Sequence, residues 1–253
     1  MDDTNICSSL LVSTMNINPE ILYEDKDILV INKPAGLVVH SDGKTVEPSV
    51  SEWLVSRYPE AKEVGEDMGE VERPGIVHRI DRDTSGVLVL DKNKEGHAHL
   101  KEQFKERLVD KVYETFVYGN LKEEHGSIKL PIGKSNSDFR KWSAERGAKG
   151  VKRDALTYYR VLGRGEGVTH VEAKPKTGRT HQIRVHFKAL HHPVVCDKLY
   201  AHQKESLLGF ERLALHAKSL TFKDLSDESH TVIAPYPEDF KHAIDTLGKP
   251  VLD

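Results

Sequence analysis

Short runs of aliphatic and β-branched residues, separated by turn residues, constrain the fold of this chain more than any other feature. Such runs occupy residues 28–32, 87–90, 112–118, 155–162, 168–173 and 213–222. Helical patterns are fewer: a short helix after Ser49 or Ser51, then 94–107, 181–190 and 237–247. The strands come in clusters and do not alternate regularly with helices. The sequence therefore predicts an α+β fold with a large mixed, mainly antiparallel β-sheet flanked by helices and loops.

The chain of 253 residues has no internal repeat and no low-complexity linker. We expect one catalytic domain over residues 21–253, which is long enough to bury a full core. Residues 1–20 are polar and patternless, so they are predicted to form a flexible leader.

Composition limits the setting of the protein. No apolar run approaches the roughly 18–20 residues of a membrane helix, and the start of the chain lacks the basic and apolar stretches of a secretory signal. The two cysteines, Cys7 and Cys196, give no pairing pattern. These features predict a cytoplasmic protein with no membrane partner, and nothing indicates an obligate protein partner.

Charge is distributed unevenly along the chain. Residues 127–190 hold 15 lysines and arginines against five acids, a balance of +10 in a chain whose net charge is −3. Such segregation is typical of a basic face that binds phosphates, although a solvated surface explains it equally well.

Asp81 is the first candidate for chemistry. Arg79 and Arg82 flank it, and Thr84 and Ser85 supply hydroxyl donors before Gly86. Neighbouring positive charge keeps a carboxylate ionised, and fixed donors orient it, as a carboxylate nucleophile requires. Taken alone, the pattern more often marks a turn aspartate in a salt bridge.

The whole segment His78–Gly86 resembles the signature of the RluA-type pseudouridine synthase family. Further segments resemble motifs of that family and follow in its order: residues 31–40, 111–115, 177–186, 197–200 and 213–217. The resemblance extends over roughly residues 21–222. It implies the pseudouridine synthase catalytic fold and an enzyme that isomerises uridine in structured RNA, either transfer or ribosomal.

The resemblance also implies roles for single residues. Asp81 would be the catalytic aspartate, Tyr113 would stack on the uracil and help deprotonate its carbon 5, and Arg184 would pair with Asp81. Arg79 would fill the gap left by the flipped uridine. The further substrate-binding candidates are His78, Thr84, Arg179 and His181. No redox or phosphoryl-transfer step occurs in this reaction, so no cofactor is expected.

Two alternative functions remain at this stage. A non-catalytic RNA-binding or RNA-folding protein could use the same scaffold. Asp25 and Asp27, like Asp81 and Asp83, could suggest a magnesium-dependent nuclease, although turn aspartates explain them equally well. The histidines at 181, 186, 191 and 192 lack the ligand combination of a zinc site, so no metal is expected.

Many members of the family that this chain resembles carry a small RNA-binding domain before the catalytic region, but only about twenty residues precede that region here. We therefore expect no separate N-terminal RNA-binding domain, which mildly favours a stem-loop of transfer RNA over ribosomal RNA.

Overall fold

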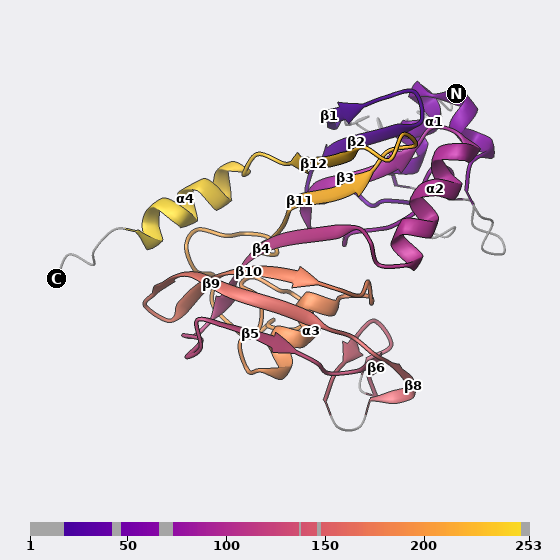
Figure 1. Ribbon diagram of the computed structural model, residues 1–253. Helices are drawn as coiled ribbons and strands as arrows, with labels where there is room; N and C mark the ends of the chain where they lie inside the picture. Colours follow the sequence, from indigo (N-terminus) through magenta and orange to yellow (C-terminus); the bar gives the residue numbers. More distant parts are fainter. Residues whose placement is uncertain (1–17, 42–46, 66–72, 137, 146–147, 249–253) are drawn as a thin grey trace, which may run out of the picture.

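The computed structural model describes residues 18–41, 47–65, 73–136, 138–145 and 148–248. Across these residues a nine-stranded sheet has the order β1-β2-β3-β11-β4-β10-β9-β5, with β12 paired to β11 (Figure 1). The strands are β1 (Glu20–Glu24), β2 (Ile28–Lys33), β3 (Ser85–Asp91), β4 (Asp110–Tyr118), β5 (His125–Ile128), β9 (Thr157–Gly165), β10 (Val168–Pro175), β11 (Leu215–Lys223) and β12 (Ser229–Ile233). Between these described strands, β3 and β11 pair in parallel and the other pairs are antiparallel. The predicted mixed, mainly antiparallel sheet is confirmed.

The helices lie on both sides of the sheet. They are α1 (Val50–Arg57), the 3₁₀ helix η1 (Pro59–Glu63), α2 (Lys94–Lys105), α3 (Gln182–Ala189) and α4 (Glu238–Leu247). The four predicted helices are present, with shifted ends. His181 lies outside α3 because its φ of 55° is left-handed, and α2 ends before Arg107 with φ 60°. The expected leader at residues 1–20 lies outside the described residues up to residue 17, and β1 already begins at Glu20.

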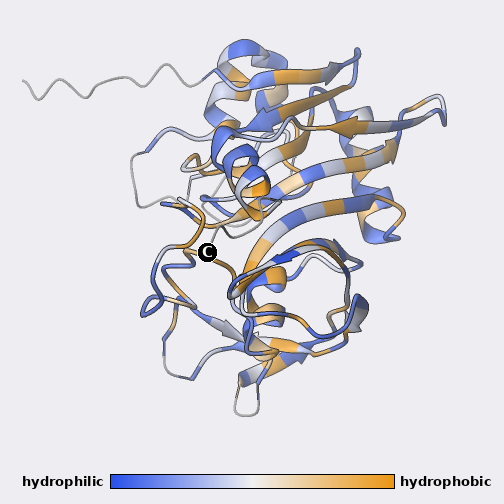
Figure 2. Cartoon of the chain, turned by 90° about the vertical axis from the view of Figure 1, so that its left-hand side faces the viewer, coloured by the Kyte–Doolittle hydropathy of each residue, from blue (hydrophilic) through white to orange (hydrophobic). Residues whose placement is uncertain are grey.

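β3 is the centre of one half of the sheet, and all seven of its residues are buried. Its side chains alternate between the two faces. Leu88 and Leu90 pack with Leu54 of α1, whereas Val87 and Val89 pack with Leu100 of α2. Burial on both faces explains why the sequence of this strand is a continuous apolar run. Figure 2 shows that the helices contain both hydrophobic and hydrophilic residues, as is typical of helices with one buried face.

The other half of the sheet is covered by α3 and α4. Phe187 of α3 and Phe240 of α4 belong to one apolar cluster with Phe116 of β4. The glycine-rich residues 163–167 separate the apolar runs 155–162 and 168–173, a pattern typical of a connection between two strands, but Gly163 and Gly165 lie within β9. A Cβ added at these two glycines would come within 2.9 and 2.6 Å of the Leu247 side chain. The glycines therefore make room for α4, and the turn itself is confined to residues 166–167.

A second, three-stranded sheet was not predicted. It has the order β7-β6-β8 and consists of β6 (Ile132–Lys134), β7 (Trp142–Ser143) and β8 (Lys149–Arg153). All five residues of β8 are exposed, so no apolar alternation marks this strand in the sequence. Its support is local: Trp142 packs on a small cluster that contains Val185 of α3 and Tyr200. The sheet is thereby attached to the segment that follows β10.

The start of α1 is set by a capping box. The Glu52 N–H donates to Ser49 Oγ at 3.3 Å, and the Ser49 N–H donates to Glu52 Oε2 at 3.0 Å. Both bonds satisfy N–H groups that have no partner within the helix. The box fixes the direction in which α1 carries Leu54 onto the sheet.

Replacing Ser49 with alanine should lower the free energy of unfolding by about 1 kcal/mol, because the cap is lost. Urea unfolding followed by circular dichroism measures this change. Ser56→Ala, on the exposed last turn of the same helix, is the matched control and should change stability much less. Equal losses in the two variants would contradict the capping role of Ser49.

Candidate active site

Asp81 lies in a tight turn between buried Ile80 and the first residue of β3. The Thr84 N–H donates to the Asp81 carbonyl at 3.1 Å, which closes the turn. The fully buried Lys33, at the end of β2, holds this turn through hydrogen bonds. Its ammonium donates to the carbonyls of Pro34 and Leu37, both at 2.8 Å, and of Arg82 at 2.9 Å. The carboxylate of Asp81 is therefore carried on a rigid loop.

The Asp81 carboxylate is held by Arg184 of α3. Arg184 Nη1 donates to Asp81 Oδ2 at 2.8 Å. The other edge of the same guanidinium binds a second, fully buried carboxylate: Nε and Nη2 donate to the two oxygens of Asp197 at 2.7 and 2.9 Å. Burial works against the charge of Arg184, but the hydrogen bonds and charges of Asp197 and Asp81 outweigh it and raise the pKa of Arg184. The guanidinium stays charged and joins α3 to the loop before β3.

Tyr113 of β4 lines the same pocket as Asp81. Burial, and then the negative charge of Asp81, raise the pKa of its phenol above the ordinary value. The side chain is consequently a neutral phenol near neutral pH. Its position offers an aromatic face beside the carboxylate.

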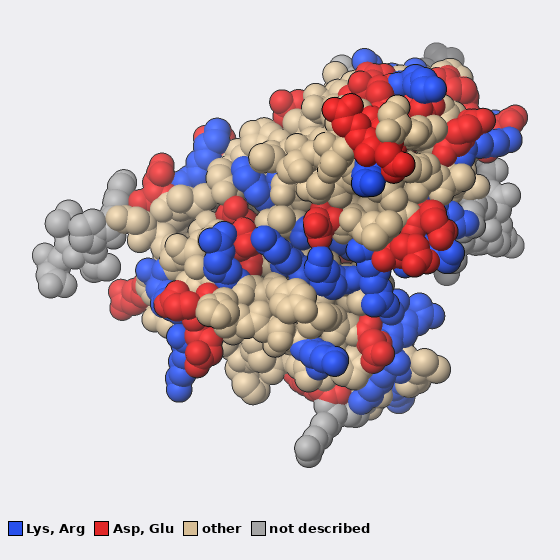
Figure 3. Space-filling view, viewed as in Figure 1, with Lys and Arg blue, Asp and Glu red and all other residues tan. Residues whose placement is uncertain are grey.

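Asp81, Tyr113 and Arg184 line one pocket of about 440 Å³. This size is typical of sites for small ligands. Asp81 is the only carboxylate among its described lining residues. Its cationic lining residues are Arg73, Arg79, Lys111, Arg179 and Arg184. Because one acid faces five bases, the pocket attracts an anionic ligand despite the negative net charge of the chain. On the face seen in Figure 3, lysines and arginines also gather at the end that carries β6 and β8, and acids are denser on the opposite half.

All eight residues singled out from the sequence line this pocket. His78 and Thr84 are engaged within the protein: Thr84 is buried, and His78 Nε2 accepts the Val89 N–H at 3.1 Å. Arg79 is exposed and approaches His40 Nε2 at 3.3 Å, and Arg179 Nε donates to the Asp154 carbonyl at 3.0 Å. The geometry brings the eight together, and their roles toward a substrate remain predictions.

Three residues that hold the site were not among the candidates predicted from the sequence. Lys33 and Asp197 fix Asp81 and Arg184 as described above, and Tyr200 binds His181 with its hydroxyl 2.9 Å from Nδ1. Asp197 Oδ1 also accepts the N–H groups of Leu199 and Tyr200, both at 3.0 Å. A lysine directly after an apolar run and before Pro34 was a usable signal for Lys33. The only signal for Asp197 was the resemblance of residues 197–200 to a family motif, which assigns this aspartate no contact.

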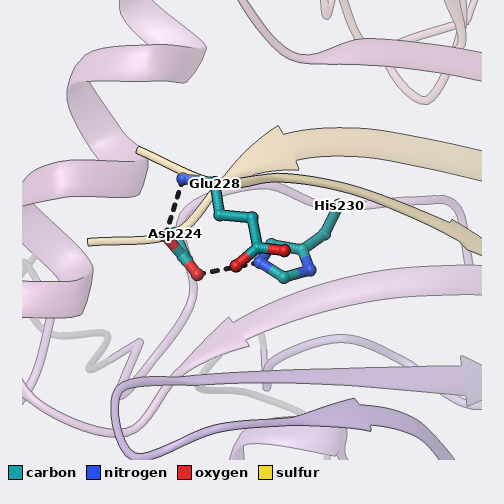
Figure 4. A group of neighbouring side chains, drawn as sticks. All are labelled: Asp224, Glu228 and His230. Atoms are coloured by element: carbon teal, nitrogen blue, oxygen red, sulfur yellow. Dashed lines mark hydrogen bonds and ion pairs between the residues drawn. The ribbon is translucent and has the colours of Figure 1, made fainter. Parts of the chain in front are cut away.

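One group of potential metal ligands is present among the described residues, and it lies outside the pocket. Asp224, Glu228 and His230 converge at the β11–β12 turn (Figure 4). Asp224 Oδ1 accepts the N–H groups of Ser226 and Glu228, and its Oδ2 lies 2.8 Å from His230 Nε2. These bonds explain the group as the closure of a turn. Among the described residues, no helix is long and apolar enough to cross a membrane.

Comparison with known proteins identifies the family. Residues 27–189 match the family described as RNA pseudouridylate synthase. The chain belongs to this family. An RNA pseudouridine synthase of Synechocystis is 39% identical over 91% of this chain and 69% of its own length. A ribosomal large subunit pseudouridine synthase D of Pseudomonas aeruginosa is 37% identical over 92% of this chain and 72% of its own length.

Solved structures agree with this assignment. Human RNA pseudouridylate synthase domain containing 1 superposes with a TM-score of 0.69 at 30% identity, covering 87% of this chain and 84% of that protein. Human RNA pseudouridylate synthase domain containing 4 gives a TM-score of 0.70 at 28% identity, covering 90% and 92%. The resemblance drawn from the motifs is confirmed. This chain is an RNA pseudouridine synthase and therefore an isomerase.

Asp197→Asn should lower the turnover of this pseudouridine synthase by about 10- to 100-fold while the fold is retained. The reason is that Arg184, once released by Asp197, would shift together with Asp81, and a displacement of about 1 Å in an active site can cost that much. Steady-state kinetics together with thermal unfolding separate the two effects. Asp239→Asn is the matched control, since Asp239 receives a two-pronged contact from Arg212 outside the pocket lining. Unchanged turnover in Asp197→Asn would contradict the positioning of Arg184 by Asp197.

His78 should make stability depend on pH. Burial, and then the charge of Lys111, lower its pKa to about 3. Below an unfolded pKa of about 6.5, the unfolded chain binds a proton at this residue and the folded chain does not, so acid removes stability. His78→Gln should abolish this contribution, about 2 kcal/mol between pH 7 and pH 5.

Urea unfolding at the two pH values measures the contribution of His78. The exposed His202, replaced with glutamine, is the control and should follow the native pH dependence. An unaltered pH dependence in His78→Gln would show that His78 does not stay neutral in the folded protein.

Proposed function

We propose that this enzyme isomerises a uridine within structured RNA, with Asp81 as the reacting carboxylate. The observation that supports this most directly is the arrangement of Asp81 in a cationic pocket, paired with Arg184 and beside Tyr113. An ionised, oriented carboxylate, an aromatic face and excess positive charge are the groups that this reaction on RNA needs.

The chemistry requires the glycosidic bond to break, the uracil to turn, and carbon 5 to join the sugar. The sugar carbon becomes electron-poor when the base departs, and an adjacent carboxylate stabilises or traps that charge, as in glycosidases. Arg184 occupies Asp81 Oδ2, which leaves Oδ1 facing the pocket. Attack on the sugar, removal of a sugar proton and addition to the base are all within the capacity of such a carboxylate.

Tyr113 is proposed as the platform for the uracil. Its raised pKa favours stacking and hydrogen-bond donation by a neutral phenol over a phenolate base in the free enzyme. Deprotonation of carbon 5 with the help of Tyr113 would need the substrate to change this balance.

RNA contact is proposed to involve the basic lining residues. The target nucleotide must leave the base stack, which costs a few kcal/mol. Arg79, exposed at the pocket, is suited to fill the vacated space, and Arg179 and His181 to contact the nucleotide itself. His78 and Thr84 are already engaged within the protein, so their proposed contribution is to shape the wall beside Asp81.

Large-subunit ribosomal RNA is the proposed substrate, because the names of three relatives at 34–37% identity describe ribosomal large subunit enzymes. Transfer RNA is the second candidate, which the motifs allow equally. We further propose that residues 21–253 act as one catalytic unit in the cytoplasm, without an added cofactor or an obligate protein partner.

Protein-free cellular RNA labelled with tritium at carbon 5 of uracil tests the proposal. Rejoining through carbon 5 expels the label, so the native protein should release tritium into water. Asp81→Asn should lower the rate by at least about 10³-fold, because an amide cannot replace the carboxylate in attack on the sugar, in removal of a sugar proton or in addition to the base. Fractionation of the RNA then shows whether ribosomal or transfer RNA is modified.

Asp83→Asn is the matched control, since this exposed carboxylate lies two residues from Asp81 in the same loop. It should retain most of the activity. Full activity in Asp81→Asn would overturn the role of Asp81. RNA binding without release from any RNA would favour the non-catalytic alternative, and cleavage that a chelator abolishes would favour a nuclease.

A further inference from the structure

His181 spans the space between a buried tyrosine and the reacting carboxylate. It precedes α3 with a φ of 55°, a left-handed conformation that histidine tolerates better than most residues. Its Nδ1 lies 2.9 Å from Tyr200 Oη, and its Nε2 lies 3.9 Å from Asp81 Oδ1. The ring is therefore fixed at one end and directed at Asp81 with the other.

The contacts of Tyr200 determine which nitrogen of His181 carries the proton. Tyr200 Oη accepts the backbone N–H of Trp142 at 3.0 Å, so its own hydrogen is available for His181 Nδ1. The opposite tautomer would place a lone pair of Nε2 against the negative Asp81 carboxylate. Electrostatics thus favours an Nε2–H that faces Asp81.

Burial keeps the His181 ring neutral, although charged groups face it from several sides. Burial lowers its pKa, and of the charged groups that face it, Arg184 and Arg79 also lower it, whereas Asp81 and Asp197 raise it. The net direction is downward, so His181 is a neutral donor near pH 7. A neutral donor leaves the negative charge of Asp81 available to the sugar.

His181 Nε2 and Asp81 Oδ1 are spaced so that one oxygen atom lying beside them can contact both. At 3.9 Å, Nε2 and Oδ1 are too far apart for a direct hydrogen bond. An oxygen about 2.8 Å from each atom would bridge them, provided that it accepts from the N–H and donates to the carboxylate. A hydroxyl group does both.

The proposed substrate carries a hydroxyl group next to the sugar carbon at which Asp81 would act. Asp81 would act at the sugar carbon that bears the base, and the neighbouring sugar carbon of RNA carries the 2′-hydroxyl. This group distinguishes RNA from DNA. We propose that His181 and Asp81 together bind the 2′-hydroxyl of the target nucleotide, so that this pocket selects ribose over deoxyribose.

Tyr200 is then a positioning residue, because it fixes the donor of His181 without touching the substrate. The inference rests on the proposed function, since it needs a nucleotide at Asp81. Tyr200 also links the small sheet to the pocket, because Trp142 of β7 supplies the N–H that directs the Tyr200 hydroxyl toward His181.

The test compares two transcripts of the RNA that the tritium assay identifies, both labelled at carbon 5, one with uridine and one with 2′-deoxyuridine. The native enzyme should favour the uridine transcript by at least about 100-fold in kcat/KM, because a site built for a hydroxyl rejects analogues that lack it. His181→Asn tolerates the left-handed backbone but is too short to reach the hydroxyl. It should reduce this preference at least tenfold.

A double-mutant cycle tests Tyr200. Tyr200→Phe should reduce the ribose preference in the native background. In a His181→Gln background its effect should be at most about twofold, because an amide N–H needs no tautomer to be fixed. Tyr118→Phe is the matched control, since Tyr118 is buried to the same 7% exposure and donates to the Glu205 carbonyl away from the pocket lining. It should leave the preference unchanged.

The possible failures are distinguishable. No tritium release from the uridine transcript would overturn the proposed function, and this inference with it. Release with an undiminished ribose preference in His181→Asn would overturn the inference alone. An equal effect of Tyr200→Phe in the histidine and glutamine backgrounds would remove the positioning role of Tyr200. Thermal unfolding of each variant establishes that the measured protein is folded.

Discussion

The guanidinium of Arg184 is the contact on which the site depends. It comes from α3, which packs on one half of the sheet, and reaches the loop before β3, which belongs to the other half. Two carboxylates share it, so Asp197 takes the paired contact and Asp81 takes a single hydrogen bond. A buried carboxylate without such a partner would be costly and would tend to protonate. The shared arginine fixes one oxygen of Asp81 and leaves the other directed into the pocket.

Rigidity around this contact comes from groups that are themselves fully bonded. The three carbonyls bound by Lys33 hold the loop of Asp81, and two backbone N–H groups hold Asp197 from behind. Charge is arranged on a larger scale as well. Among the described residues that line the pocket, five bases outnumber one acid, so a chain of net charge −3 still presents a positive site to RNA.

Much of the fold could be predicted because its elements are determined locally. The apolar run of β3 and the cap at Ser49 each follow from neighbouring residues. The glycines at 163 and 165 are typical of a turn in the sequence, whereas in the structure they make room for the side chain of Leu247, more than eighty positions later. The exposed β8 strand was missed because hydrogen bonding to β6, and not burial, makes it a strand.

The site divides in the same way. The sequence by itself determined which chemical groups are present, and the motif order was enough to name Asp81, Tyr113 and Arg184 together. Only the tertiary structure decided how they meet, because the Asp81–Arg184 contact joins residues 103 positions apart and the Lys33–Arg82 contact joins residues 49 positions apart. The protonated nitrogen of His181 was likewise decided by Tyr200 and Asp81, which reach it from two different segments. Residue types follow from the sequence, whereas distances, burial and the direction of a proton depend on contacts that form when the chain folds.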